Sequence, residues 1–427
     1  MMKTRYLDYF QVTSRNVICA IYAIYAIREV RLAFDGEQYS ALGHMITLAL
    51  PPLAIVAGFL YVFKQRRIVM DKVHRKQLFL PAIFALMSLH FYDSLRPVLH
   101  MIPIFFFLLM RVKDRIRTFD YFYWIVQWNN VISLFFFVCY KFSVNIGYTL
   151  VPRYGTLVPG FYQKWLFFAI HETGFVLGGR LCGIFNEPGG LGTICALLFI
   201  ARFKYSKTWE KLLLAAAVLC TLSFAGILLI LMFLSVYRLQ FGKKYLLILL
   251  AGVALFFAMP YIDWGDPQMN AFAGRFEIID GKLAGDNRTN ALYDQKFREF
   301  LSSGPILIGY GAGYQVHGNV IEASYKHFIL EYGLLGSSLL MVLWLFLSVQ
   351  SARRNLDCIF LVVFFMLSVY QRSYAIASIF GYVILFGGMD WIHHMARQQI
   401  CGLSYADTLL KVFPARKRFL YEEAKNR

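Results

Sequence analysis

The sequence predicts an all-α polytopic membrane protein of about 12 transmembrane helices, with two long segments outside the membrane. Hydrophobic residues make up 59% of the 427 residues and charged residues only 16%. A soluble domain has about 45–50% and about 25% respectively. Several apolar runs reach the roughly 17–25 residues that span a hydrocarbon core. Short basic clusters separate these runs, as expected for cytoplasmic loops.

The apolar runs divide the chain into alternating membrane and external parts. The first helix is the weakest because Arg28, Glu29 and Arg31 interrupt it. The predicted helices lie near 16–34, 41–63, 78–92, 97–111, 121–141, 189–203, 212–237, 245–262, 327–350, 357–372 and 375–392. The resulting parts are N-terminal helices (1–141), a first external segment (142–188), central helices (189–262), a second external segment (263–326), C-terminal helices (327–392) and a basic cytoplasmic tail (393–427).

The net charge of +18 does not predict a nucleic-acid-binding protein, because the basic residues do not form one patch and no nucleic-acid-binding motif accompanies them. Their clusters follow the positive-inside pattern of short cytoplasmic loops, and both termini are predicted to be cytoplasmic. The clusters lie at 64–76, 111–117, 202–211, 238–244, 352–354 and 415–418. The seven cysteines are scattered, without the paired spacing of a zinc or redox site.

The run 212–237 has basic clusters at both ends, so a single crossing would place one of them outside. We therefore expect two short helices with a break near Ser223–Gly226. Each arm is too short for a full span, and such breaks are tolerated where protein or a cavity surrounds the exposed backbone.

The loop GGRLCGIFNEPGGLG (178–192) is unusually rich in polar residues and glycine for the mouth of a membrane helix. Asn186 is a candidate cap for a helix starting at 187, and Pro188 suits its first turn. Free amides and the positive helix end, approached through Gly189 and Gly190, would bind an anion. Arg180 would add a bidentate phosphate donor. The alternative is that this arginine only reaches lipid headgroups and that the acid at 187 only favours the helix dipole.

The second external segment carries a similar set of polar residues. Arg275, Arg288 and Arg298 precede GYGAGYQVHGNVIEASYKHFILEYGLLG at 309–336, whose first three glycines predict a flexible turn. His317, His327 and Glu322 are candidate general bases for a hydroxyl. For each histidine, an interfacial hydrogen-bonded residue is the simpler interpretation. An acid next to a membrane-entering helix, in contrast, is functional by default.

The order of these motifs resembles that of the O-antigen polymerase and O-antigen ligase superfamily, the Wzy-type bacterial envelope glycosyltransferases. The resemblance spans residues 170–340 and rests on the NEPG loop, TLSFAG at 221–226, the arginine-bearing external segment, GYGAG and EYGLLG. It departs from the family at Phe224, where an arginine is usual. The ligase branch also has a His-Asn pair, whereas here Gly318 separates His317 from Asn319. The acidic NEPG motif is closer to the polymerase branch.

The resemblance implies a GT-C-like, metal-independent glycosyltransferase without a cofactor at the periplasmic face of the bacterial inner membrane. Such an enzyme joins repeat units carried on undecaprenyl diphosphate into O-antigen, capsular or exopolysaccharide. Arg180 and Arg288 would hold the diphosphate, with Asn186, Glu187 and Arg275 in the binding set and the base left open among Glu322, His317 and His327. Expected partners are the lipid-linked donor and acceptor, membrane lipids, a flippase and a chain-length regulator.

Two other functions remain as alternatives at this point. A ligase would transfer finished glycan to lipid A-core. A transporter of lipid-linked sugar would carry charged residues on broken helices at mid-membrane. The few mid-span charges, and the concentration of polar residues at the outer rim, favour an enzyme that works at the surface.

Overall fold

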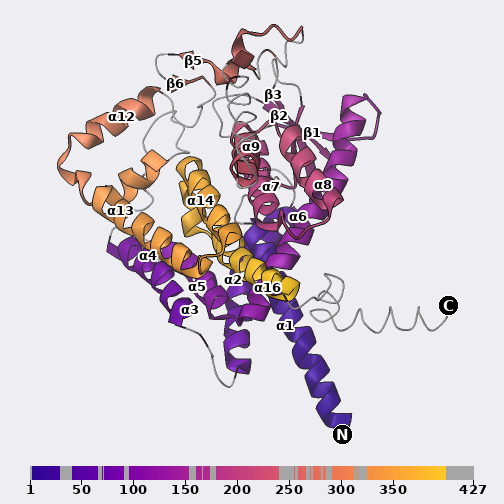
Figure 1. Ribbon diagram of the computed structural model, residues 1–427, viewed down its shortest axis with the longest axis vertical. Coiled ribbons are helices and arrows are strands. Elements are labelled where there is room, and N and C mark those ends of the chain that lie inside the picture. Colours follow the sequence, from indigo (N-terminus) through magenta and orange to yellow (C-terminus); the bar gives the residue numbers. More distant parts are fainter. Residues whose placement is uncertain are drawn as a thin grey trace, which may run out of the picture.

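The protein is described from a computed structural model, shown in Figure 1, in which helices predominate. The described residues are 2–28, 41–65, 70, 72–90, 96–152, 160–165, 167–173, 179–239, 254, 258–265, 270, 273–279, 282–284, 291–311, 314 and 325–400. Of these, two helices, Val112–Lys141 and Tyr325–Ala352, are long and apolar enough to cross a membrane, and several shorter helices are also apolar.

The N-terminal part contains helices α1 to α6. Prolines 51 and 52 lie inside α2. The fifth predicted span begins earlier than expected, because the basic cluster at 111–117 is itself helical with Arg111 as the N-cap. The bounds are α1 Met2–Arg28, α2 Ala41–Lys64, α3 Lys72–Gln77, α4 Phe79–His90, α5 Arg96–Leu109 and α6 Val112–Lys141.

The first external segment contains a four-stranded antiparallel sheet in the order β1-β2-β3-β4. The all-α prediction is therefore wrong here, although the molecule is mostly helical. Aromatic residues favour a half-buried pleated surface, and Trp165 stacks on Phe136 of α6 with ring centroids 5.1 Å apart. The strands are β1 Thr149–Pro152, β2 Gly160–Trp165, β3 Phe168–Thr173 and β4 Gly179–Gly183.

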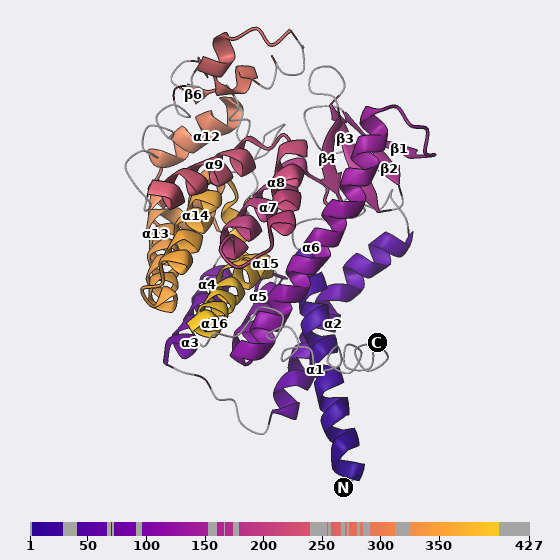
Figure 2. The ribbon, with the colours of Figure 1, turned by 45° about the vertical axis from the view of Figure 1, so that its right-hand side comes forward.

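The central part contains α7 Pro188–Arg202, α8 Thr208–Cys220 and α9 Phe224–Leu239. The predicted break in the run 212–237 is confirmed, since α8 ends at Cys220 and α9 begins at Phe224. Both arms pack against α7, as Figure 2 shows. Protein therefore surrounds the break, as tolerance of an interrupted helix requires. Most of the helix predicted near 245–262 lies outside the described residues.

The second external segment consists of short elements. Figure 1 shows it at the same end of the molecule as the sheet. Its elements are η1 Met259–Tyr261, η2 Gly274–Phe276, β5 Ile278–Ile279, β6 Lys282–Leu283, α12 Ala291–Leu301 and η3 Gly304–Ile306. The strands β5 and β6 form an antiparallel hairpin.

The C-terminal part differs from the prediction in its last helix. The predicted helix near 375–392 is divided into a 3-10 turn, a short α-helix, a π-helical turn and a further α-helix. The elements are α13 Tyr325–Ala352, α14 Leu356–Gln371, η4 Ser373–Ala377, α15 Ile379–Tyr382, η5 Val383–Gly387 and α16 Gly388–Ile400. Inside α13, Gly333 has φ 65° and ψ 179°, which kinks the helix.

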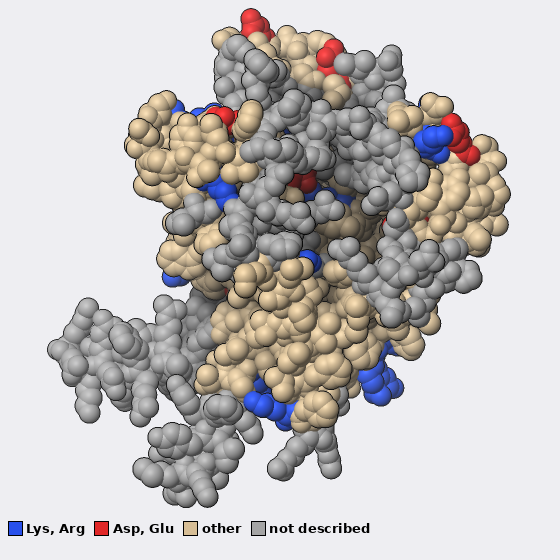
Figure 3. All heavy atoms as spheres, turned by 180° about the vertical axis from the view of Figure 1, so that it is seen from behind, with Lys and Arg blue, Asp and Glu red and all other residues tan. Residues whose placement is uncertain are grey.

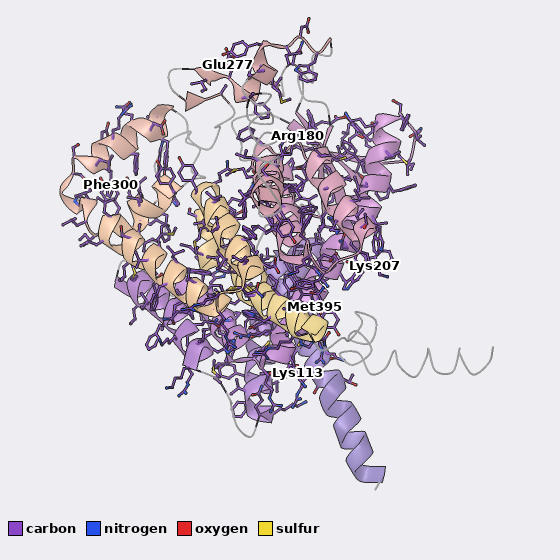
Figure 4. The ribbon with its side chains drawn as sticks, in the orientation of Figure 1. Lys113, Arg180, Lys207, Glu277, Phe300 and Met395 are labelled. Atoms are coloured by element: carbon purple, nitrogen blue, oxygen red, sulfur yellow. The ribbon has the colours of Figure 1, made fainter. Side chains whose placement is uncertain are left out.

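The two ends of the molecule differ in charge. Figure 3 shows acidic residues only in its upper part among the coloured atoms of that face, whereas Lys and Arg also occur at the lower end. Figure 4 places Arg180 in the upper part and Lys113 near the lower end. The basic clusters at 64–76, 111–117 and 352–354 meet at this lower end around one cavity. Three of the six predicted basic clusters therefore lie on one side of the molecule.

A first prediction concerns the packing of α7 against the helix break. A Cβ atom at Gly192 would lie 2.6 Å from Ser223 Cβ and 2.8 Å from Thr221 Oγ1. We expect Gly192→Ala to lower the free energy of unfolding by about 1–3 kcal/mol, because overpacking displaces the break. Thermal unfolding in detergent measures this. Gly147→Ala is the control, since no atom lies within 4 Å of its Cβ position, and an equal loss in both variants would contradict the prediction.

Candidate functional site

Arg180 of β4 holds the end of the broken helix. Its Nε donates a hydrogen bond to the carbonyl oxygen of Thr221 at 2.9 Å, and its Nη2 donates to that of Leu222 at 3.2 Å. These are carbonyls that a helix C-terminus leaves without intrahelical partners. Leu222 has φ 46°, a left-handed conformation that is rare for a leucine. The guanidinium therefore stabilises a strained turn between α8 and α9.

The loop that leads from β4 into α7 is held from two sides. On α6, the Asn129 Oδ1 atom accepts a hydrogen bond from the backbone N–H of Ile184 at 2.9 Å. On β2, the Tyr162 hydroxyl donates to the Asn186 carbonyl oxygen at 2.5 Å. These bonds place the N-terminus of α7 at the rim of the sheet.

The predicted capping role of Asn186 is wrong. Glu187 occupies the N-cap position of α7, which begins at Pro188, and no side-chain capping hydrogen bond is formed there. Asn186 contributes its backbone carbonyl to the loop instead. The physical reason is that Tyr162 anchors the residue from the sheet, which shifts the cap by one position.

Arg372 belongs to the site but is not among the residues predicted from the sequence. It follows α14, and its side chain is 5% exposed. Its Nη1 donates to Glu187 Oε2 at 3.0 Å and to the Tyr374 hydroxyl at 2.8 Å. Among the described residues, its buried Nε and Nη2 atoms have no hydrogen-bond partner. A signal was present in the sequence, because the predicted span 357–372 ends on this arginine, and ionisable residues within a membrane span are costly and functional by default.

The second external segment reaches the helix break through an aromatic contact. Phe224, at the position where the resembled family has an arginine, packs edge-to-face against Phe276 with ring centroids 4.9 Å apart. Leu222 also packs against Phe276. This contact brings η2, and therefore the backbone of Arg275, beside the break. The Arg275 side chain and the whole of Arg288 lie outside what the structure describes.

The glycine motif at 309–313 packs on the kink of α13. The N–H of Tyr310 donates to the Leu330 carbonyl at 2.8 Å, and that of Gly311 donates to the Glu331 carbonyl at 2.9 Å. The N–H of Leu335 donates a hydrogen bond to the Leu307 carbonyl oxygen at 3.1 Å. For the described part of the motif, the prediction of a flexible turn is therefore wrong, because the backbone on both sides of Gly309 is bonded to α13.

The structure describes one of the three candidate bases, His327. His327 lies in the first turn of α13, with its Nε2 3.6 Å from Glu331 Oε1. Tyr325, in the same turn, stacks on Tyr370 of α14 with centroids 4.7 Å apart, which places this turn beside the segment that carries Arg372. His317 and Glu322 lie outside the described residues.

The structure therefore brings Arg180, Glu187 and the η2 segment to the junction of α7 with the helix break, and it adds Arg372. Arg372 keeps a pair of donors, Nε and Nη2, that suits a phosphate-bearing group, because guanidinium groups recognise phosphate with paired donors. Arg180 adds positive charge at the same junction, although its Nε and Nη2 already bond the Thr221 and Leu222 carbonyls. Within the described residues, no cluster of three or more potential metal ligands occurs. Comparison of the chain with known protein families, curated proteins and solved structures finds no match.

Proposed function

We propose that the protein is an inner-membrane polysaccharide polymerase that joins repeat units carried on undecaprenyl diphosphate at the periplasmic face. The observation that carries the proposal is the buried guanidinium of Arg372, which meets the N-cap residue of α7 and keeps two unpaired donors among the described residues. Buried donors without partners are costly, and a diphosphate would supply acceptors for them. The proposal that this anion is the diphosphate of an undecaprenyl carrier comes from the sequence resemblance.

In the proposed reaction, a sugar hydroxyl of the acceptor attacks the anomeric carbon of the donor glycan. The new C–O bond forms as the bond to the diphosphate oxygen breaks, and undecaprenyl diphosphate leaves as an anion. The hydroxyl proton passes to a base, for which Glu322, His317 and His327 are the candidates. Preorganised positive charge at the leaving group, from Arg372, Arg180 and Arg288, would supply the main catalytic stabilisation.

The membrane location rests on the exposed faces of the helices. Leu335, Leu339, Val342, Phe346 and Val349 of α13 are each more than half exposed, and their spacing forms one stripe along the helix. A soluble monomer rarely exposes an apolar surface of this extent. Lipid contact is the simplest explanation, and it supports the proposed membrane location.

The test is an electrophoretic gel of lipid-linked glycans from cells that lack the gene, with and without a plasmid copy. If the protein is a polymerase, cells that lack the gene should make single-repeat products in place of the ladder, and the plasmid copy should restore the ladder. A ladder that persists on undecaprenyl diphosphate would indicate a ligase. Unchanged glycans would overturn both enzyme functions and favour a transporter.

A second prediction concerns the arginines of the diphosphate site. We expect Arg180→Ala and Arg288→Ala each to abolish long polymer, because each would weaken binding of the leaving group. Protein levels in the membrane should stay normal for Arg288→Ala, whereas Arg180→Ala also removes the hydrogen bonds to Thr221 and Leu222, so its thermal unfolding is measured as well. Immunoblotting and the glycan gel measure the two quantities. If either variant still makes full-length chains, the diphosphate role fails for that residue.

A further inference from the structure

A cavity of about 360 Å³ lies at the end of the molecule opposite the proposed active site. Figure 4 shows this separation, with Lys113 and Met395 in the lower half of the molecule and Arg180 well above them. The cavity is enclosed by α3, the start of α6, the end of α13 and α16. Its lining combines residues from three of the basic clusters that the sequence predicts to be cytoplasmic, together with the start of the basic tail.

The acid in the cavity lining, Asp390 of α16, is already neutralised. Arg115 Nη2 lies 2.7 Å from Asp390 Oδ2, and His74 Nε2 lies 3.3 Å from Asp390 Oδ1. Gln77 accepts a hydrogen bond from Arg115 Nη1 at 2.9 Å and donates one to the Ser351 hydroxyl at 2.8 Å. The floor of the cavity is therefore a fixed, locally balanced polar network.

The rim of the cavity carries positive charge without such compensation. Lys113 and Arg397 are exposed lining residues, and neither has an ion-pair partner among the described residues. His394 lines the same cavity, and burial, followed by the charges of Lys113 and Arg397, lowers the pKa of its imidazole. Crowding of like charges around a partly buried group is unfavourable, and a bound anion would relieve it.

We propose that this cavity binds the phosphate group of an anionic ligand from the cytoplasmic side. Lys113 and Arg397 would hold the phosphate oxygens at the rim through charge-assisted hydrogen bonds. The inner wall is partly apolar, with Val112, Ile116 and Phe386 among its residues. An anionic phospholipid headgroup and a soluble phosphate ester share the required chemistry. This site is independent of the proposed polymerase reaction, but its cytoplasmic position rests on the proposed membrane topology.

The experiment uses the delipidated full-length chain in detergent and native mass spectrometry to measure bound ligand. Phosphatidylglycerol is titrated against phosphatidylcholine, which has the same phosphodiester but no net charge, and inorganic phosphate is titrated separately. The double variant Lys113→Gln/Arg397→Gln is compared with Lys76→Gln/Lys207→Gln. The second pair removes two exposed basic residues that do not line the cavity.

We expect saturable binding of one anionic ligand, weakened about tenfold for each rim cation removed and unchanged in the control pair. Preference for phosphatidylglycerol would identify a lipid headgroup, whereas saturation by inorganic phosphate alone would identify a soluble anion. The absence of saturable binding to either would overturn the proposal, and so would equal losses in both double variants. Thermal unfolding of each variant verifies that the fold is retained.

Discussion

Replacing Arg372 by alanine should reduce long-chain polymer by about 10²–10³-fold, the effect of removing one preorganised donor to a developing anion. The side chain is 5% exposed and donates to Glu187 and Tyr374 through Nη1 alone. Its Nε and Nη2 atoms are buried and have no partner among the described residues. If they bind the departing diphosphate, the polymer ladder on a glycan gel should collapse while the protein remains in the membrane.

Arg372 could also act only by pairing with Glu187, and a double variant separates the two roles. Removing one partner of a buried ion pair leaves an uncompensated charge, and removing both relieves that cost. We therefore compare Arg372→Ala with Arg372→Ala/Glu187→Gln. A diphosphate ligand predicts that both make only short products. Recovery of the ladder in the double variant would contradict the role and assign Arg372 to the fold.

The sequence predicted the helical regions well because their apolar runs are long and their ends are marked by basic clusters. The break in 212–237 was predictable on charge grounds, since a single crossing would place one of the two basic clusters outside. The sequence did not indicate which side chain bonds the exposed backbone carbonyls at the break. Arg180 satisfies the carbonyls of Thr221 and Leu222 from a strand that lies about forty positions earlier in the chain.

The sheet of the first external segment was missed because aromatic residues are equally typical of a membrane interface and of a pleated sheet. Pairing between strands decides between these interpretations, and pairing is a long-range property. For the same reason, the ion pair of Arg372 with Glu187, which joins positions 185 residues apart, could not be predicted. The residue types could be interpreted from the sequence, but the residues that they contact could not be predicted from it.

The two glycine motifs illustrate this limit further. GYGAG and EYGLLG look like independent features in the sequence, and the first resembles a flexible loop. In the structure, Gly309 and Gly333 face each other. A Cβ atom on Gly309 would lie 2.5 Å from the backbone nitrogen of Gly333, and one on Gly333 would lie equally close to that of Gly309. Each motif requires glycine because the other approaches it, which a single sequence does not show.

Gly333→Ala should therefore be the most destabilising of the glycine substitutions considered. The residue has φ 65° and ψ 179°, a region that is essentially restricted to glycine. A Cβ atom would also collide with the backbone carbonyl of Leu307, which accepts the hydrogen bond from Leu335. Strain and overpacking together should cost about 3 kcal/mol or more, a large fraction of a typical total stability of about 5–15 kcal/mol.

Two controls separate the contributions to this effect. Gly265 has φ 66° but no atom within 4 Å of its Cβ position, so Gly265→Ala reports the conformational cost alone, about 1–2 kcal/mol. Gly304→Ala has neither feature and should leave the unfolding midpoint nearly unchanged. Gly309→Ala should approach the loss seen for Gly333→Ala, since the two positions share one contact. If Gly333→Ala melts no lower than Gly265→Ala, the close approach of the two motifs does not stabilise the fold. The kink of α13 would then be held by the backbone hydrogen bonds from Tyr310, Gly311 and Leu335.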